Sequence, residues 1–395
     1  QRLSMNIIIH RGTHQIGGSA VEISTKTTRI ILDMGDEFSL EADFIPRPLT
    51  IQGVTEGRGN CKGVLISHYH GDHLGQLKNV LSEVPIYMGE LSKEIALIPA
   101  EYQDKELYLR LLGANTFSGG KVFTIGDIRI RPIVIDHSAA DSYMFVIEAD
   151  GKRILYTGDF RLHGLKSHYI ERLIKTYVGP VDVLITEGTA LSQNQYNTIS
   201  EAEVLDDIKS YISDGKYVFI MCASTNIDRI MGIWQNLPDD KVLLCDRYQK
   251  SILDTVIEST YYDSTLYKRH AKPIVTDCGA YPAPYMRDGF VSLMRCTESY
   301  IDKIEAFPKD DVRIVYSMWP GYIKHNKLLK ELLDTYSSYI CHSSGHITLT
   351  DLVKFVNLVN PNITIPIHTE SPAYLEEILT DRTIQVLNDK EVFVI

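Results

Sequence analysis

Short apolar runs, several of them alternating with polar residues, dominate the first half of the chain. They lie at residues 20–23, 29–32, 63–66, 128–135, 143–147 and 181–186. Alternation with a period of two is typical of strands that bury one face. A helical stretch over 92–112 lies between them. Strands and helices mixed in this order predict sheets covered by helices, in an α/β layered domain.

The pattern changes after about residue 190. Helix-like and strand-like segments then follow each other, with helices over 200–213 and from 226, and strands over 217–221, 241–244, 273–275 and 312–315. This alternation favours a mostly parallel sheet with crossover helices. From 341 the chain returns to histidine-bearing loops and ends in a strand over 391–395. We expect the first part of one domain over 5–190, an inserted domain over 191–340 and a return segment over 341–395.

The bulk properties agree with a large globular protein. The 395 residues, 44% hydrophobic and 23% charged, suit two or three packed domains. No run reaches the ~18 to 20 apolar residues of a membrane helix and no signal segment opens the chain, so we expect a cytoplasmic protein without membrane contact. The six cysteines form no C-x-x-C pair, which predicts buried free thiols rather than a zinc knuckle.

The segment Ser67-His68-Tyr69-His70-Gly71-Asp72-His73 carries the strongest chemical signal and directly follows an apolar strand. In a loop leaving a strand, His68 and His70 can reach one ion while Asp72 and His73 reach a second. Imidazole and carboxylate ligands suit zinc, and a catalytic site keeps one position open for water. The alternative is a solvated histidine-rich loop.

Three later residues, His137, Asp159 and His368, also follow apolar runs. Taken singly, each would be read as a capping or hydrogen-bonded residue. The repeated placement at strand ends favours one shared site instead.

Together these residues resemble the ligand series of the metallo-β-lactamase superfamily, which is His-x-His-x-Asp-His, a further His, Thr-Gly-Asp and a late His. The resemblance implies a four-layer αββα sandwich. It assigns His68, His70 and His137 to one metal, Asp72, His73 and His368 to a second, and Asp159 to a bridge between them. It also implies that Asp33 orients the metal loop, by which we mean residues 67–73.

Three segments resemble the β-CASP subgroup of nucleic-acid hydrolases, which includes ribonuclease J. They are Thr186-Glu187-Gly188-Thr189, Ser343-Ser344-Gly345-His346 and Pro366-Ile367-His368-Thr369. The insertion between the first two is where that subgroup has its extra domain. Ser344 and Gly345 can offer a hydroxyl and a backbone N–H to a phosphate, and His346 can stabilise charge or protonate the leaving oxygen.

The resemblance implies hydrolysis of RNA phosphodiester bonds by a hydroxide that two divalent ions activate, with Asp72, Glu187 and His346 as catalytic residues. Zinc is the first expectation and manganese the alternative. The expected substrate is single-stranded RNA, cut internally, from the 5′ end, or both. In the insertion, Ser224, Asn226 and Ser317 are candidate phosphate contacts and Trp319 a candidate base-stacking residue, although plain turn chemistry explains them equally well.

Alternatives remain open at this stage. They are a DNA nuclease of the same subgroup, a hydrolase of a small thioester, lactam or cyclic nucleotide, and a metal-free relative that only binds nucleic acid. The net charge of −11 is unusual for a nucleic-acid enzyme, and Lys268-Arg269-His270 is the only basic aromatic patch that we single out. His163 follows the Asp159 loop and is a candidate to line the cleft. The oligomeric state is not predicted.

Overall fold

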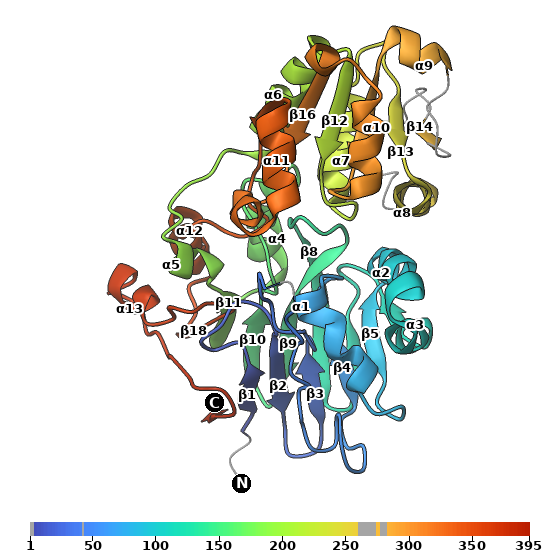
Figure 1. The fold of residues 1–395 in the computed structure, drawn as a ribbon. Helices are drawn as coiled ribbons and strands as arrows, with labels where there is room; N and C mark the ends of the chain where they lie inside the picture. The colour runs from blue at the N-terminus through green and yellow to red at the C-terminus, as the bar shows by residue number, and fades with distance from the viewer. Residues whose placement is uncertain (1–3, 42, 260–273, 277–282) are drawn as a thin grey trace.

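A computed structural model of the chain describes residues 4–41, 43–259, 274–276 and 283–395. It contains three β-sheets (Figure 1). Two lie together in the lower part of Figure 1, and the third forms the upper part. Among the described residues, no helix is both long and apolar enough to span a membrane.

The two lower sheets pack face to face. The first has the strand order β19 (Val392–Val394), β1 (Asn6–Arg11), β2 (Ala20–Ser24), β3 (Arg29–Leu32), β4 (Gly63–Leu65), β5 (Ile86–Gly89) and β6 (Asn115–Phe117). The second has the order β18 (Ile363–Ile367), β11 (Val183–Glu187), β10 (Lys152–Tyr156), β9 (Ser142–Ala149), β8 (Ile128–Ile135) and β7 (Phe123–Ile125). Period-two alternation makes this possible, since Ile7 and Ile9 of β1 join one core with Ile130 and Ile147 of the second sheet.

Helices cover the outer faces of both sheets. The outer face of the first packs against α2 (Glu90–Gln103) and the neighbouring α3 (Lys105–Leu112), and that of the second against α4 (Ile170–Tyr177) and α12 (Leu349–Val359). These four layers confirm the predicted αββα sandwich. The predicted helical stretch over 92–112 is divided into these two helices, α2 and α3. Asp104 is extended and its carboxylate accepts a hydrogen bond from the Leu107 N–H, so a second helix begins there.

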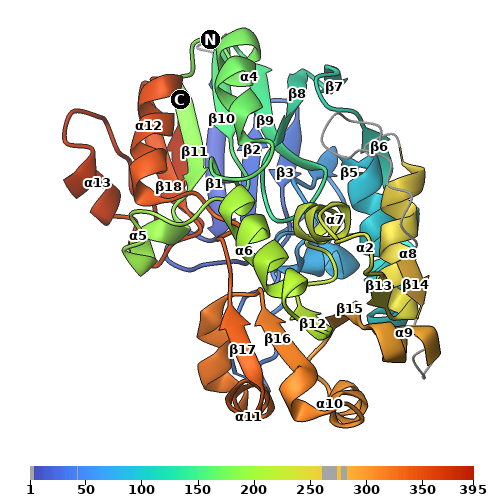
Figure 2. The same ribbon diagram turned by 90° about the horizontal axis from the view of Figure 1, so that it is seen from above.

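The third sheet is entirely parallel, as the alternating pattern predicts. Its order is β14 (Ile274–Thr276), β13 (Leu243–Cys245), β15 (Phe290–Met294), β12 (Tyr217–Met221), β16 (Val312–Tyr316) and β17 (Ser337–Ile340). Figure 2 shows α6 (Glu201–Ser213) and α7 (Ile227–Gln235) on one face, and α10 (Glu298–Glu305) and α11 (Lys327–Thr335) on the other. The remaining longer helix, α8 (Arg247–Glu258), contacts α2 of the sandwich.

The last segment of the chain completes both lower sheets. β18 pairs in parallel with β11, and β19 pairs antiparallel with β1. The third sheet is therefore inserted between two parts of the sandwich, while the domain limits at 190/191 and 340/341 stay predictions. Among the described residues, no disulfide is formed by Cys61, Cys222, Cys245, Cys296 or Cys341. Cys278 and the candidate patch Lys268-Arg269-His270 lie outside the described residues.

A buried ionic network joins the inserted sheet to the sandwich. Arg161, Glu201 and Arg229 are fully buried. Glu201 Oε2 accepts from Arg161 Nη1 at 2.8 Å, and its Oε1 accepts from Arg229 Nε at 2.7 Å. Arg161 also donates to Asp136 Oδ1 at 2.8 Å. Burial alone would raise the pKa of Glu201, but the two guanidinium groups lower it to about 2.

We predict that Glu201→Ala lowers the free energy of unfolding by about 3 to 5 kcal/mol, because it leaves two buried guanidinium groups without their shared carboxylate. Urea titration followed by tryptophan fluorescence measures this. The parental advantage is complete above the ordinary glutamate pKa of 4.5 and declines as the pH falls towards about 2. Asp206→Ala, at an exposed residue of the same helix, is the control, and equal losses for both variants would contradict the prediction.

Candidate functional site

The predicted ligands gather where strands of both sandwich sheets end. His68, His70, Asp72 and His73 follow β4, His137 follows β8, Asp159 follows β10 and His368 follows β18. β3 and β4 run parallel, as do β10, β11 and β18. Their carboxyl ends therefore meet at one edge of the sandwich, the edge that faces the inserted sheet (Figure 1).

One group of ligand atoms consists of the His68, His70 and His137 nitrogens, all within 4.8 Å of one another. Burial lowers the pKa of His68 and His137 well below the ordinary histidine value and that of His70 to about 4. Neutral imidazoles have a lone pair ready for a metal ion. His137 Nδ1 lies 2.6 Å from the carbonyl of Gly345, which can only accept, so Nδ1 carries the proton and Nε2 is the free ligand atom.

The second group consists of Asp72, His73, Asp159 and His368, again within 4.8 Å. Asp159 Oδ2 lies 3.1 Å from His73 Nε2 and 4.0 Å from His68 Nε2, so this carboxylate stands between the two groups. Burial alone would lower the pKa of His73, but Asp159, Asp33 and Asp72 raise it. The second group therefore contains two carboxylates, whereas the first consists of imidazoles alone.

The donor set fits two divalent ions. His68 Nε2 and Asp159 Oδ1 are buried and have no hydrogen-bond partner within the described part of the chain. Leaving such atoms unpaired is costly, and a cation at each group would satisfy them. Imidazole and carboxylate without thiolate suit zinc and also admit manganese.

Asp33 fixes the metal loop through hydrogen bonds. It is fully buried, and its carboxylate accepts from the Ser67 N–H at 2.7 Å, the Ser67 hydroxyl at 2.8 Å, His73 Nδ1 at 2.8 Å and the Tyr156 hydroxyl at 2.6 Å. The Ser67 hydroxyl donates to Asp33, so it accepts from His68 Nδ1 at 3.0 Å. Both histidines consequently present Nε2 to the site, as outer hydrogen bonds do in metal centres.

Backbone geometry adds to this support. Asp33 and His368 have φ values of 60° and 56°, a left-handed conformation uncommon for non-glycine residues and recurrent at functional sites. The Thr189 hydroxyl lies 2.8 Å from His368 Nδ1, which leaves Nε2 facing Asp72 at 3.1 Å. A Cβ on Gly35 would lie 1.6 Å from the backbone oxygen of Asp72, so only glycine allows this loop to close on the metal loop.

His346 and Glu187 lie together beside the second group. His346 Nδ1 is 3.1 Å from Glu187 Oε2 and 3.6 Å from Asp159 Oδ2. Glu187 is buried, and its Oε1 accepts from the Phe160 N–H at 2.9 Å. Burial alone would lower the pKa of His346, but Glu187 and Asp159 raise it to about 9. Asp159, Glu187 and His346, with His368, also form a third group able to hold an ion.

The candidate substrate contacts have mixed placements. Ser344 and Gly345 precede His346 and are half-buried, and the Ser344 hydroxyl accepts from the His346 N–H at 3.1 Å. Ser224 is half-buried after β12, next to Thr225, whose carbonyl accepts from the Tyr69 hydroxyl at 2.6 Å. Asn226 is buried, and its Oδ1 has no hydrogen-bond partner among the described residues.

Ser317 does not present its hydroxyl group to a substrate. Its side chain is buried, and its hydroxyl donates to the Cys341 carbonyl at 2.7 Å. The proposed phosphate contact therefore has no structural support, whereas Trp319, two residues later, is 37% exposed.

Some residues of the site escape sequence reasoning. Tyr69, inside the metal motif, donates to the Thr225 carbonyl and accepts from the Ala140 N–H at 2.8 Å, and so joins the metal loop to the inserted sheet. Thr189 stands within the quoted Thr-Glu-Gly-Thr segment, and Tyr156 directly precedes the Thr-Gly-Asp segment. Their proximity to the motifs is a signal, but their partners are set by tertiary packing.

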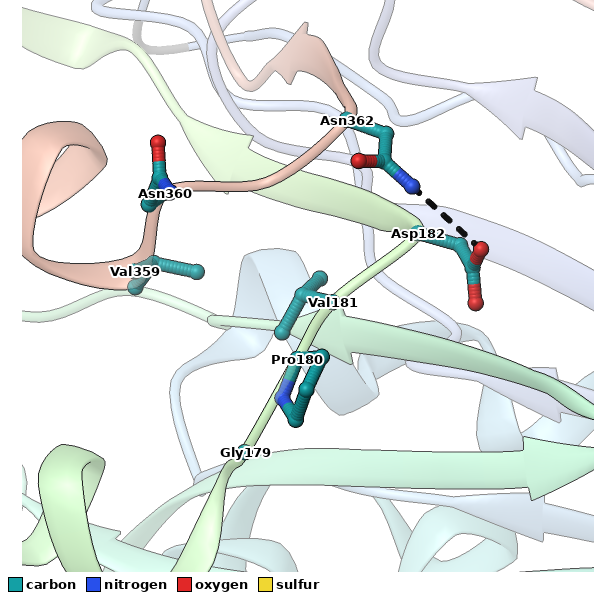
Figure 3. Close-up of a pocket in the computed structure, with 7 residues that line it drawn as sticks. All are labelled: Gly179, Pro180, Val181, Asp182, Val359, Asn360 and Asn362. Carbon is teal, nitrogen blue, oxygen red and sulfur yellow. Dashed lines mark hydrogen bonds between the residues drawn. The ribbon is translucent and has the colours of Figure 1, made fainter.

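A separate hollow of about 420 Å³ lies at the other end of the second sheet. Figure 3 shows it between residues 179–182 and Val359, Asn360 and Asn362. Asp182 and Asn362 immediately precede β11 and β18, whereas Glu187 ends β11 and His368 follows β18. The hollow is thus remote from the ligand groups and contains none of the clustered histidines.

Comparison with known proteins agrees with this geometry. A β-lactamase superfamily domain matches residues 28–212, which include the metal loop, His137 and Asp159. Residues 28–212 of the chain therefore carry a domain of the β-lactamase superfamily.

The chain is also similar to ribonuclease J proteins, which supports the β-CASP resemblance. It is 23% identical to ribonuclease J of Helicobacter pylori over 93% of this chain and 56% of the relative. It is 23% identical to that of Mycoplasma genitalium over 91% of this chain and 67% of the relative. The chain thus spans little more than half the length of the first of these relatives.

One solved structure shares the fold as a whole. A crystal structure of a protein of unknown function from Enterococcus faecalis V583 superposes with a TM-score of 0.80 at 18% identity. The match covers 99% of this chain and 100% of that one. The inserted sheet is therefore part of a fold that the two chains share.

We predict that the chain binds two divalent ions, since the two groups resemble paired sites about 3.5 to 4 Å apart. Elemental analysis after reloading with zinc or manganese measures the stoichiometry. His68→Ala should lose the ion of the first group, while His168→Ala, at an exposed histidine, should keep both. A reloaded chain without bound metal would refute this prediction.

Proposed function

We propose that this protein is a metal-dependent nuclease that hydrolyses RNA phosphodiester bonds at the edge shared by the sandwich and the inserted sheet. The proposal rests above all on His346, which reaches the second ligand group from the segment returning from the inserted sheet. The similarity to ribonuclease J along most of the chain supports it.

The geometry of His346 suits a group that acts on a phosphate. Its Nδ1 donates to Glu187, which leaves Nε2 for a substrate oxygen, and its side chain is 27% exposed. An imidazole held in this way can stabilise charge on a phosphate oxygen or protonate the leaving oxygen. Glu187 fixes the orientation of the ring and is itself held by the Phe160 N–H.

The seven ligands would hold two divalent ions, His68, His70 and His137 one of them, Asp72, His73 and His368 the other, with Asp159 shared. Bound there, the ions would supply Lewis-acid activation of water and of the phosphate. Asp33 and Thr189 orient His73 and His368 through their outer nitrogens. Zinc is our first choice of metal and manganese the second.

An exposed basic segment follows the carboxyl end of β16. Residues 319–330 contain three lysines, one histidine and no carboxylate, in a chain of net charge −11. Lys324, Lys327 and Lys330 are exposed and follow the carboxyl end of β16, and Lys327 Nζ lies 3.6 Å from Glu331 Oε1. Burial and, after it, the charge of Asp72 raise the pKa of Tyr322, which lies two residues before Lys324. Lysines so placed suit nucleic-acid phosphates.

A small-substrate hydrolase is the second candidate, because the metallo-β-lactamase sandwich also carries such activities. That reading gives no function to His346 or to the exposed lysines, and we therefore rank it below the nuclease. A DNA strand fits the same phosphate contacts. Parallel assays of a 5′-labelled RNA and the DNA of the same sequence decide between them and show whether cutting is internal or from the 5′ end.

We predict that His346→Ala lowers RNA hydrolysis by ~10²-fold or more, the scale of a lost general acid or charge stabiliser. Metal content and thermal stability should stay at the parental level, with His168→Ala as the matched control. Cleavage at the parental rate would remove His346 from the mechanism. Loss of metal instead would make His346 a ligand of the third group.

We predict that replacing Lys324 and Lys327 together by Ala weakens binding of single-stranded RNA and reduces its salt dependence. Each lost phosphate contact should lower the slope of log K against log salt by about 0.7. Fluorescence anisotropy over a salt series measures this. The control replaces Lys216 and Lys309, two exposed lysines at the amino ends of β12 and β16, on the opposite edge of the sheet. Equal slopes for both pairs would exclude the segment as a phosphate contact.

A further inference from the structure

The return segment that carries His346 is anchored along its backbone. Arg229 Nη2 donates to the Ser343 carbonyl at 3.2 Å, His163 Nε2 to the Ser344 carbonyl at 2.8 Å, and His137 Nδ1 to the Gly345 carbonyl at 2.6 Å. Three consecutive carbonyls before His346 are thus each held by a side-chain donor. Such repeated anchoring restricts a loop far more than one contact does.

His163 supplies the central anchor from the sandwich. It lies four residues after Asp159 and is half-buried, and its own carbonyl accepts from the Glu201 N–H at 2.9 Å. A carbonyl oxygen has no proton to give, so Nε2 must be the protonated nitrogen of this ring. Arg161 Nη1 approaches the same Ser344 carbonyl at 3.4 Å.

Arg229 supplies the anchor from the inserted sheet. It is fully buried in α7, and Glu201 accepts from its Nε at 2.7 Å and its Nη2 at 2.8 Å. Its Nη1 donates to the Ser317 carbonyl at 3.0 Å, directly after β16. One guanidinium group therefore ties α6, the end of β16 and the return segment together.

We propose that His163 and Arg229 are positioning residues for His346, one from the sandwich and one from the inserted sheet. They fix the main chain so that His346 Nδ1 stays bonded to Glu187 and Nε2 stays open to the substrate. The proposal rests on the nuclease function for its kinetic consequence. A loop released from these anchors spends less time in the reactive geometry, so the rate of chemistry falls while substrate affinity does not.

The first test is His163→Ala, because a half-buried residue can be replaced without leaving a buried charge unpaired. We expect kcat for RNA cleavage to fall about tenfold with KM unchanged, the scale of one lost hydrogen bond. His163→Gln, whose amide can donate to the Ser344 carbonyl, should recover part of the loss. His168→Ala is the matched control. Arg229→Lys should act in the same direction, and its larger loss of stability is measured separately.

A double-mutant cycle tests whether the effect passes through His346. In the His346→Ala background, His163→Ala should cause no further loss of kcat. The same tenfold loss in both backgrounds would overturn the proposal, as would an unchanged kcat in the His163→Ala chain.

A second measurement does not depend on RNA. Hydrogen–deuterium exchange of a peptide covering residues 341–347 should be faster in the His163→Ala chain than in the His168→Ala chain, with the peptide over 68–73 unchanged. Unchanged exchange over 341–347 would overturn the anchoring role. A parental chain that cleaves no RNA would refute the nuclease function, while the exchange experiment would still decide whether His163 holds the loop.

Discussion

The buried carboxylate of Asp33 is the contact on which the site depends most. It lies after β3 of the first sheet, and its donors come from the metal loop and from Tyr156, which ends β10 of the second sheet. A carboxylate without water must be surrounded by donors, and each donor must stand within hydrogen-bond reach. This requirement sets the separation of the two sheets at the edge where the ligands meet. It also sets the ring orientation of His73 directly and of His68 through Ser67.

Charged side chains lie both on the surface and in the junction between the sandwich and the inserted sheet. Burial determines how strongly they constrain the structure. Many acidic and basic side chains of the described residues are exposed. The junction between sandwich and insertion instead encloses Arg161, Arg229 and Glu201, and Lys166 lies 3.0 Å from Asp228. Buried ion pairs add little net stability but tolerate few alternative arrangements. These buried ion pairs fix the inserted sheet relative to the sandwich, so that His346 reaches a site whose other residues come from the sandwich.

Much of the site could be predicted from the sequence because the signals are local. A ligand type directly after an apolar strand predicts a strand-end loop, and strands of one sheet end at shared edges. The apolar face of α12 is likewise periodic enough to be assigned to the core, where Leu349, Leu352 and Val356 are buried. The layered fold follows from the same alternation of periods.

The rest could not be predicted because it depends on contacts distant in sequence. Arg229 and Ser343 are separated by 114 residues, and no local sequence pattern predicts the hydrogen bond between them. Ser317 looks like a loop serine, yet its hydroxyl is enclosed by the neighbouring strand end. The break at Asp104 depends on whether a carboxylate caps the following turn or points to solvent, a choice that helix propensity does not decide.

The late return of the chain to the sandwich has a consequence for biosynthesis. β11 and β18 are adjacent, yet the inserted sheet lies between them in sequence, and His368 follows β18. On a ribosome, a nascent chain long enough to fold the first strands, with His68 to His73 already exposed, still lacks part of the second ligand group. Closing so long a loop is slow, because its ends must meet before their contacts can stabilise it. Assembly of the full ligand set therefore has to wait until the inserted sheet has been synthesised.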